Sequence, residues 1–116
     1  MDMQSKQLSK PKDTVIKKLI LKQNYKGFGD FYSVNKELIY RTLANLFKSL
    51  KRKDKNIVIL VLGAKINGLQ WETELKFKRQ ESIVLVRDIL PFFEENEDYE
   101  TCGEITETYN KILENQ

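Results

Sequence analysis

Few residues of this chain could carry covalent or acid–base chemistry. The sequence has no histidine and one cysteine, Cys102. These counts exclude a His-based catalytic triad, an imidazole general base, an internal disulfide and a Cys/His zinc site. The carboxylates of Glu100 and Glu104 lie close to Cys102 in the sequence, and neighbouring negative charge raises the pKa of a thiol. We therefore expect a structural cysteine, no metal site and no cofactor.

One pair of carboxylates has a spacing that suits catalysis. Glu72 and Glu74 lie two residues apart in an alternating segment, so both point to one face of a strand, about 7 Å apart. A hydrolase could use such a pair as its acid and base. However, Lys76 and Lys78 continue the same row, which is typical of a solvated strand face. We predict that the chain is not an enzyme, with a small RNase that works without histidine as the alternative.

Charge is distributed unevenly along the chain. Residues 1–80 carry 18 Lys or Arg and 7 Asp or Glu, a net charge of +11, whereas residues 81–116 carry 2 and 10, a net charge of −8. Such asymmetry between two halves indicates an interaction surface. Three interpretations remain open: a basic surface that binds nucleic acid, an acidic surface that binds a basic partner, and an acidic end that folds back on the basic half.

The segments before residue 53 predict an arm, a strand and a helix. Residues 1–13 are polar and lysine-bearing, and we expect a flexible basic arm there. Residues 14–22 fit a helix or a strand, and their β-branched content favours a strand. The glycines of residues 26–32 indicate a turn or loop. Residues 34–52 predict a helix capped by Ser33, with one apolar stripe formed by Ile39, Leu43, Leu46, Phe47 and Leu50.

Residues 57–79 predict a β-hairpin. A run typical of a buried strand precedes Asn67-Gly68, which suits a two-residue type I′ turn, and an alternating segment follows it. A two-residue turn would pair Ile66 with Leu69 and Val58 with Phe77. One face of the hairpin is then apolar apart from Thr73, and we expect the helix over 34–52 to cover that face.

The remaining segments complete an α+β domain. Residues 83–86 predict a third antiparallel strand, with the start of a helix as the alternative, and we expect Pro91 to end either element. Residues 94–100 are acidic and predict an irregular segment, whereas residues 104–114 predict a closing helix. The expected order is β-α-β-β-β-α, an antiparallel sheet packed by helices within a single domain over 14–116 that has an acidic end at 94–116.

The first functional hypothesis is Coulombic binding of nucleic acid. At 100° per residue, Arg41, Lys48 and Arg52 share the helix face opposite the apolar stripe. The cations expected to contact phosphate are Arg41, Lys48, Arg52, Lys53, Lys55, Lys76 and Lys78. Aromatic residues beside lysines are candidates for stacking on unpaired bases. They are Tyr25, Phe28, Phe31 and Tyr32.

The second hypothesis is a protein-interaction module, such as an inhibitor, adaptor or subunit, of a kind that mobile elements encode. Its surface would be an open sheet edge or the acidic segment. The acidic candidates are Glu94, Glu95, Glu97, Asp98, Glu100 and Glu104. Open strand edges also permit a homodimer. The longest apolar run has eight residues, against about 20 for a membrane span, so we expect no membrane association. The lone cysteine and the absence of an N-x-S/T sequon fit a reducing interior, so we expect a cytoplasmic location.

Overall fold

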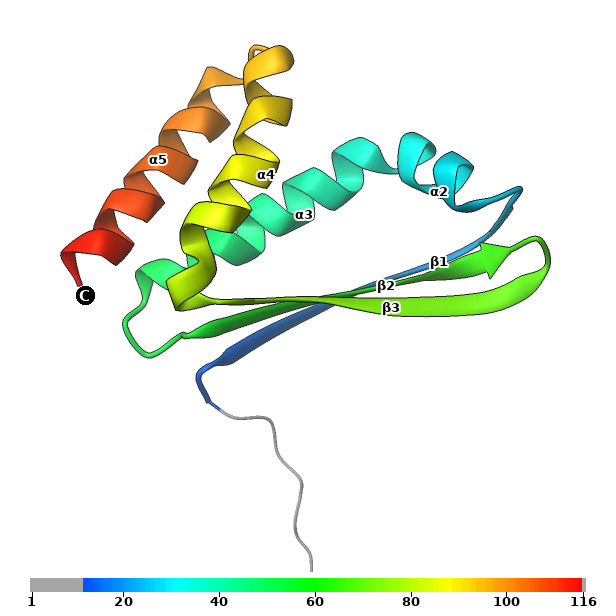
Figure 1. Ribbon diagram of the computed structural model, residues 1–116, viewed down its shortest axis with the longest axis horizontal. Helices are drawn as coiled ribbons and strands as arrows, with labels where there is room; N and C mark the ends of the chain where they lie inside the picture. The colour runs from blue at the N-terminus through cyan, green and yellow to red at the C-terminus, as the bar shows by residue number, and fades with distance from the viewer. Residues whose placement is uncertain (1–11, 116) are drawn as a thin grey trace, which may run out of the picture.

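The computed structural model describes residues 12–115, where three strands form one sheet and the helices lie on one side of it (Figure 1). The predicted α+β class is confirmed. Most of the predicted N-terminal arm, residues 1–11, lies outside the described residues. In chain order the elements are β1 (Thr14–Tyr25), α2 (Phe28–Val34), α3 (Lys36–Lys48), a 3₁₀ turn (Ser49–Lys51), β2 (Ile57–Ile66), β3 (Leu69–Lys78), a second 3₁₀ turn (Arg79–Glu81), α4 (Ser82–Glu95) and α5 (Tyr99–Glu114).

The sheet is mixed, which corrects the prediction of an antiparallel sheet. Its order is β1-β2-β3, with β1 parallel to β2 and β2 antiparallel to β3. The strand predicted over 14–22 is present and continues to Tyr25. Because α2 and α3 carry the chain back along the sheet between β1 and β2, the two strands run in the same direction. The start of β1, the start of β2 and the end of β3 therefore lie at one end of the sheet, where Thr14 faces Ile57 and Ile57 faces Lys78.

The hairpin of β2 and β3 has the predicted register. Ile66 faces Leu69 and Val58 faces Phe77. Asn67 and Gly68 both have positive φ, at 52° and 80°, as a type I′ turn requires. The β2 side of the expected apolar face is buried against the helices, since Val58, Leu60 and Leu62 have at most 1% of their surface exposed, whereas Leu69 of β3 is 74% exposed.

The helix predicted over 34–52 is present as α3 and the 3₁₀ turn that follows it, and a separate short helix, α2, precedes α3 and meets it at Asn35. The side-chain amide of Asn35 donates to the carbonyl of Phe31 (2.8 Å), while its own carbonyl accepts from the N–H of Ile39 (2.9 Å). Asn35 thus closes α2 and starts α3, and Ser33, the predicted cap, lies inside α2. The turn or loop predicted over residues 26–32 is mostly helical, because α2 begins at Phe28. The predicted apolar stripe is buried on α3 and the 3₁₀ turn that follows it.

Residues 83–86 form the start of α4, which corrects the prediction of a third antiparallel strand. Leu85, Ile89 and Phe93 follow one another at intervals of four and are fully buried. A helix buries all three on one stripe, and this burial decides between the two readings of the apolar run. The prediction that Pro91 ends this element is wrong. Pro91 lies inside α4, and burial of Phe93 on the turn beyond it offsets the hydrogen bond that proline cannot make.

The acidic segment 94–100 is more regular than predicted. It forms the end of α4, a three-residue connection and the start of α5. Asp98 caps α5, because its carboxylate accepts from the Thr101 N–H (3.2 Å) and the Thr101 hydroxyl (2.8 Å). The predicted closing helix therefore begins five residues earlier, at Tyr99.

Candidate nucleic-acid interface

Acidic residues of the C-terminal segment lie against the basic face of α3. The Arg41 guanidinium contacts the Asp98 carboxylate at 3.0 Å, and Lys48 contacts Glu104 at 3.0 Å. Just beyond α3, a third pair joins the ammonium of Lys51 to Glu107 at 3.0 Å. Of the three interpretations of the charge asymmetry, the structure supports the one in which the acidic end folds back. Two of the predicted phosphate ligands, Arg41 and Lys48, thus pair with carboxylates of the C-terminal segment.

The pKa values of the carboxylates agree with these contacts. Hydrogen bonds from Thr101, and then the Arg41 guanidinium, hold the pKa of Asp98 below its usual range. The Lys51 ammonium lowers the pKa of Glu107. Both carboxylates thus remain ionised at neutral pH.

The anchor of α5 is apolar. Exposed ion pairs contribute about 0–1 kcal/mol each. In contrast, Ile105, Thr108 and Ile112 are fully buried under α5, and burying an isoleucine contributes about 1.5–3 kcal/mol. The ion pairs therefore determine the charge of this surface and contribute little to its stability. The charged residues of α5 can be replaced while the helix stays packed against the domain.

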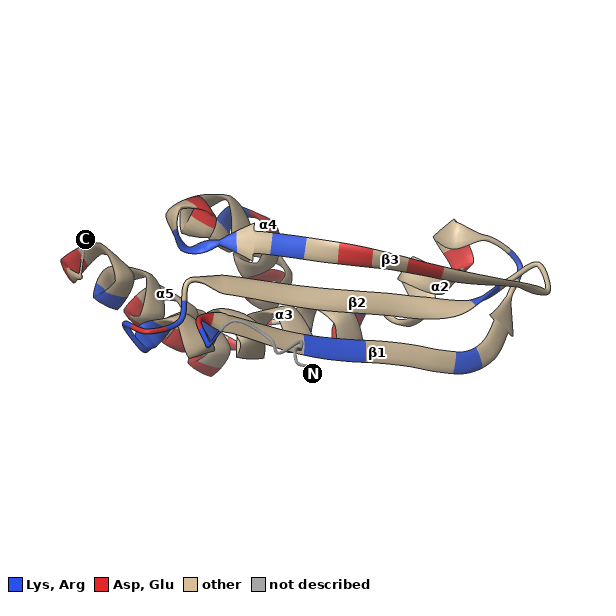
Figure 2. Ribbon diagram, turned by 90° about the horizontal axis from the view of Figure 1, so that it is seen from below, with Lys and Arg blue, Asp and Glu red and all other residues tan. Residues whose placement is uncertain are grey.

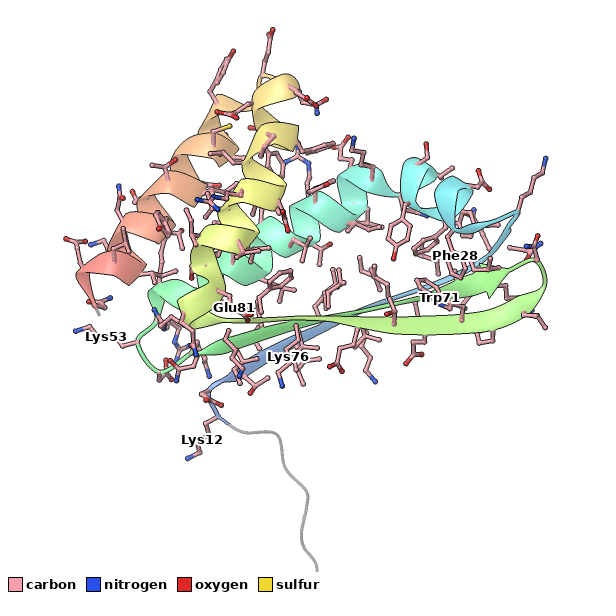
Figure 3. The ribbon with its side chains drawn as sticks, viewed as in Figure 1. Lys12, Phe28, Lys53, Trp71, Lys76 and Glu81 are labelled. Carbon is pink, nitrogen blue, oxygen red and sulfur yellow. The ribbon has the colours of Figure 1, made fainter. Side chains whose placement is uncertain are left out.

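Several lysines lie over the half of the sheet that contains the start of β1, the start of β2 and the end of β3. Lys18 lies furthest from that end, since it faces Val61 of β2, which in turn faces Glu74 of β3. Figure 3 shows Lys12, Lys53 and Lys76 apart from one another in this half of the molecule, with Lys76 pointing away from the helices. We define the basic end as Lys12, Lys18, Lys53, Lys55, Lys76 and Lys78. Within residues 12–115, only Lys55 of these six has a carboxylate within 4.0 Å, that of Asp54 at 3.8 Å. Four predicted phosphate ligands, Lys53, Lys55, Lys76 and Lys78, thus belong to the basic end.

The loop that carries Lys53 and Lys55 is held by Arg79. The Arg79 side chain donates to the carbonyl of Arg52 (2.6 Å) and to the carbonyl of Lys55 (Nε–O, 3.1 Å). Arg52 itself, the remaining predicted phosphate ligand, pairs with Asp54 at 3.2 Å. Sequence reasoning had missed Arg79, whose role depends on the end of β3 lying beside this loop.

Replacing Arg79 by alanine should loosen the loop. Hydrogen bonds from a charged group contribute about 1.5–3 kcal/mol each. The partly buried contact with the Lys55 carbonyl and the exposed contact with the Arg52 carbonyl would both be lost. We expect the free energy of unfolding, measured by urea denaturation, to fall by about 2–3 kcal/mol. Lys36→Ala, at an exposed position on α3, is the control. Equal stability of the two variants would contradict the role of Arg79.

The predicted stacking aromatics do not join the basic end. Phe31 is fully buried and Tyr25 is 5% exposed, so both rings belong to the core. Phe28 and Tyr32 are partly exposed and lie beside Trp71, with ring centroids 4.9 Å and 6.3 Å away. Figure 3 places Phe28 and Trp71 at the far end of the sheet from the labelled lysines. The aromatic rings and the basic end therefore form two separate surfaces.

The predicted acidic surface is divided. Asp98 and Glu104 contact α3, as described above. The other four candidates are exposed around the connection between α4 and α5. They are Glu94, Glu95, Glu97 and Glu100.

The groups considered for catalysis are not assembled into a site. Burial, reinforced by Glu94 and Asp98, raises the pKa of the Cys102 thiol, and a thiol with a raised pKa is a poor nucleophile. Glu72 and Glu74 are exposed on the sheet face that the helices leave open. Across residues 12–115, no group of three or more Cys, Asp or Glu side chains is arranged to hold a metal ion.

Two further findings bear on the class of protein. None of the helices formed between residues 12 and 115 has the length and apolar character needed to cross a membrane. Comparison with protein families, with curated proteins and with solved structures finds no match to this chain.

Proposed function

We propose that this chain is a non-enzymatic domain that binds nucleic acid at the basic end. The observation that carries the proposal is the separation of charge in three dimensions. The acidic helix α5 lies against the cations of α3, while five of the six lysines of the basic end have no carboxylate within 4.0 Å among the described residues. Like charges gathered at one end attract a polyanion and release its counterions on binding.

The chemistry of the basic end favours contact with phosphates over recognition of bases. Lysine ammonium groups act as point charges on flexible stems, and phosphate contacts position a nucleic acid without reading its sequence. The aromatic rings that could stack on bases lie at the other end of the sheet (Figure 3). We therefore infer binding with little sequence preference and a strong dependence on salt.

The acidic segment is the weaker candidate surface. Two of its six predicted residues, Asp98 and Glu104, already contact cations of α3. The remaining four glutamates lie around one helix connection. Glu94 borders a hollow that Leu90, Cys102 and several polar residues of α5 also line.

Removing the negative charge of α5 tests the proposal as a gain of function. The double variant Glu104→Lys/Glu107→Lys releases Lys48 and Lys51, which precede Lys53 by five and two residues. Two to four more phosphate contacts should raise the affinity for mixed-sequence nucleic acid roughly tenfold or more and steepen its salt dependence. Fluorescence anisotropy at several salt concentrations measures both quantities.

The matched control carries the same change in charge elsewhere. Glu94→Lys/Glu95→Lys adds the same four units of charge near the connection between α4 and α5, far from the basic end (Figure 1). The proposal predicts a smaller gain for this control. Equal gains in the two variants would mean that net charge alone, and not the basic end, attracts the nucleic acid.

A further inference from the structure

The outer edge of the sheet at β3 has free backbone groups. In the sheet order β1-β2-β3 of the described residues, β3 pairs with β2 alone. A two-residue turn makes Ile66 and Leu69 a hydrogen-bonded pair. The odd-numbered residues of β3 therefore bond to β2, and the even-numbered residues direct their N–H and C=O groups to the outer edge. Of these outward groups, the Lys78 N–H already donates to the Glu81 carboxylate (2.7 Å). Such an edge is a template for another strand.

The same even-numbered residues place an ordered row of charges beside that edge. Glu72 and Glu74 are followed by Lys76 and Lys78, and all four side chains are exposed on the open face of the sheet. In Figure 2 the row is visible along β3 as red and then blue segments, whereas β1 shows blue only. Two acids followed by two bases form a row that complements itself when it is reversed.

We propose that β3 pairs antiparallel with β3 of a second copy of this chain, about a two-fold axis at Leu75. Glu74 then faces the partner's Lys76, and Glu72 faces the partner's Lys78. The two-fold axis repeats both pairs, which gives four pairs of opposite charge and a continuous sheet of six strands. An isologous contact of this kind closes after two copies.

Neighbouring registers are less favourable. Even-numbered residues must face even-numbered residues, because only these present free hydrogen-bonding groups at the outer edge. A shift of the axis to Glu74 places that carboxylate opposite itself, and a shift to Lys76 places that ammonium opposite itself. Each shift leaves two pairs of opposite charge and adds one pair of like charge, so the axis at Leu75 is preferred.

The helix side of β3 also suits a second copy. Leu75 and Phe77 are partly buried and line a groove of about 550 Å³ between β3 and the helices. The other apolar and aromatic residues of this groove are Tyr32, Ile39, Tyr40, Leu43 and Leu85. In the proposed register Leu75 faces the partner's Leu75, so the grooves of the two copies meet at the axis. The apolar surface that they cover would add to the charge pairs.

The edge at β1 does not offer this complementarity. Its exposed charged residues are all lysines: Lys17, Lys18 and Lys22. Two copies of β1 placed side by side would bring like charges together, and lysines on an edge strand oppose pairing. The charge pattern therefore selects β3.

The inference does not depend on the proposed function. Lys76 and Lys78 belong both to the basic end and to the outer edge of β3. In the dimer each would lie beside a glutamate of the partner. Lys12, Lys18 and Lys53 would remain available to a nucleic acid. Association is measured without nucleic acid, so the failure of one proposal leaves the other intact.

Two opposite charge variants test the register. Glu72→Lys/Glu74→Lys makes the row wholly basic, and Lys76→Glu/Lys78→Glu makes it wholly acidic. Within one chain Glu74 faces Val61 and Lys76 faces Ile59, so the described structure loses no ion pair in either variant. Lys17→Glu/Lys18→Glu, on β1, is the control for a change of charge at the other edge.

Sedimentation over a concentration series gives the mass of each species. We expect a wild-type mass of twice 13.7 kDa and the same for the β1 control. In each β3 variant the dissociation constant should rise at least roughly tenfold, because four cross-strand pairs become repulsive. An equimolar mixture of the two β3 variants should restore a dimer that contains one copy of each.

Three results would overturn the inference. They are a wild-type protein that stays monomeric throughout the series, β3 variants that dimerise as tightly as the wild type, and a mass that grows beyond two copies. Hydrogen exchange on the wild type gives an independent readout if a variant fails to fold. The amides of Glu74 and Lys76 should exchange more slowly as the protein concentration rises, and unchanged exchange at these two amides would also overturn the inference.

Discussion

Phe31→Ala is expected to lower the free energy of unfolding by about 3–5 kcal/mol, the usual cost of deleting a buried phenylalanine ring. Phe31 is fully buried, and its ring makes edge contacts with Tyr25 at 5.3 Å and Trp71 at 5.5 Å between centroids. Alanine would leave a cavity between α2 and the sheet. Such a loss is a large fraction of the roughly 5–15 kcal/mol that stabilises an ordinary domain.

Phe28→Ala is the matched comparison for Phe31→Ala. Phe28 lies on the same helix and also touches Trp71, yet 49% of its surface is exposed. We expect a loss of about 1 kcal/mol, close to the contribution of one aromatic pair. Urea denaturation of both variants measures the difference. Similar losses in the two would contradict the assignment of Phe31 to the core and reopen its role as a stacking residue.

Reversing three charges of the basic end should abolish most nucleic-acid binding. The variant Lys12→Glu/Lys18→Glu/Lys53→Glu removes three phosphate contacts and replaces them with repulsive carboxylates. Each lost contact lowers the slope of log affinity against log salt by about 0.9, so the slope should fall by about 2.7. Near 0.15 M salt, a loss of this size corresponds to roughly 100-fold weaker binding.

The control triple changes lysines at the other end of the sheet. Lys22→Glu/Lys26→Glu/Lys65→Glu alters the net charge by the same six units, and all three side chains are exposed. Lys65 faces Asn24 of β1, close to the hairpin turn and far from the start of the strands. The account predicts a much smaller loss for this triple. Equal losses would show that the basic end has no special role.

The hairpin could be predicted in full because its determinants are local. Asn67-Gly68 fixes the turn, and the alternation that follows fixes which side chains face the core. The secondary structure of residues 83–86 could not be predicted in the same way. Four apolar residues suit a strand or a helix equally, and only the burial of Leu85, Ile89 and Phe93 together selects the helix.

In the candidate site, too, the features that depend on neighbouring residues could be predicted, and those that depend on distant residues could not. Helical spacing correctly placed Arg41 and Lys48 on α3, away from its apolar stripe. The partners of these cations, Asp98 and Glu104, lie 56 or 57 residues further along the chain and meet α3 only in the fold. The net charges of the two halves indicated such an encounter without specifying its residues. The parallel pairing of β1, which brings Lys12 to the basic end, is equally non-local.

The most direct test of the account is a titration of the wild-type protein with labelled nucleic acid. Mixed-sequence single- and double-stranded DNA and RNA would be followed by fluorescence anisotropy at several salt concentrations. The account predicts micromolar or tighter binding near 150 mM salt, with a log–log slope equivalent to several phosphate contacts. Flat titrations, or binding confined to very low salt, would contradict it and show that the lysines of the basic end are solvated charges without a nucleic-acid partner.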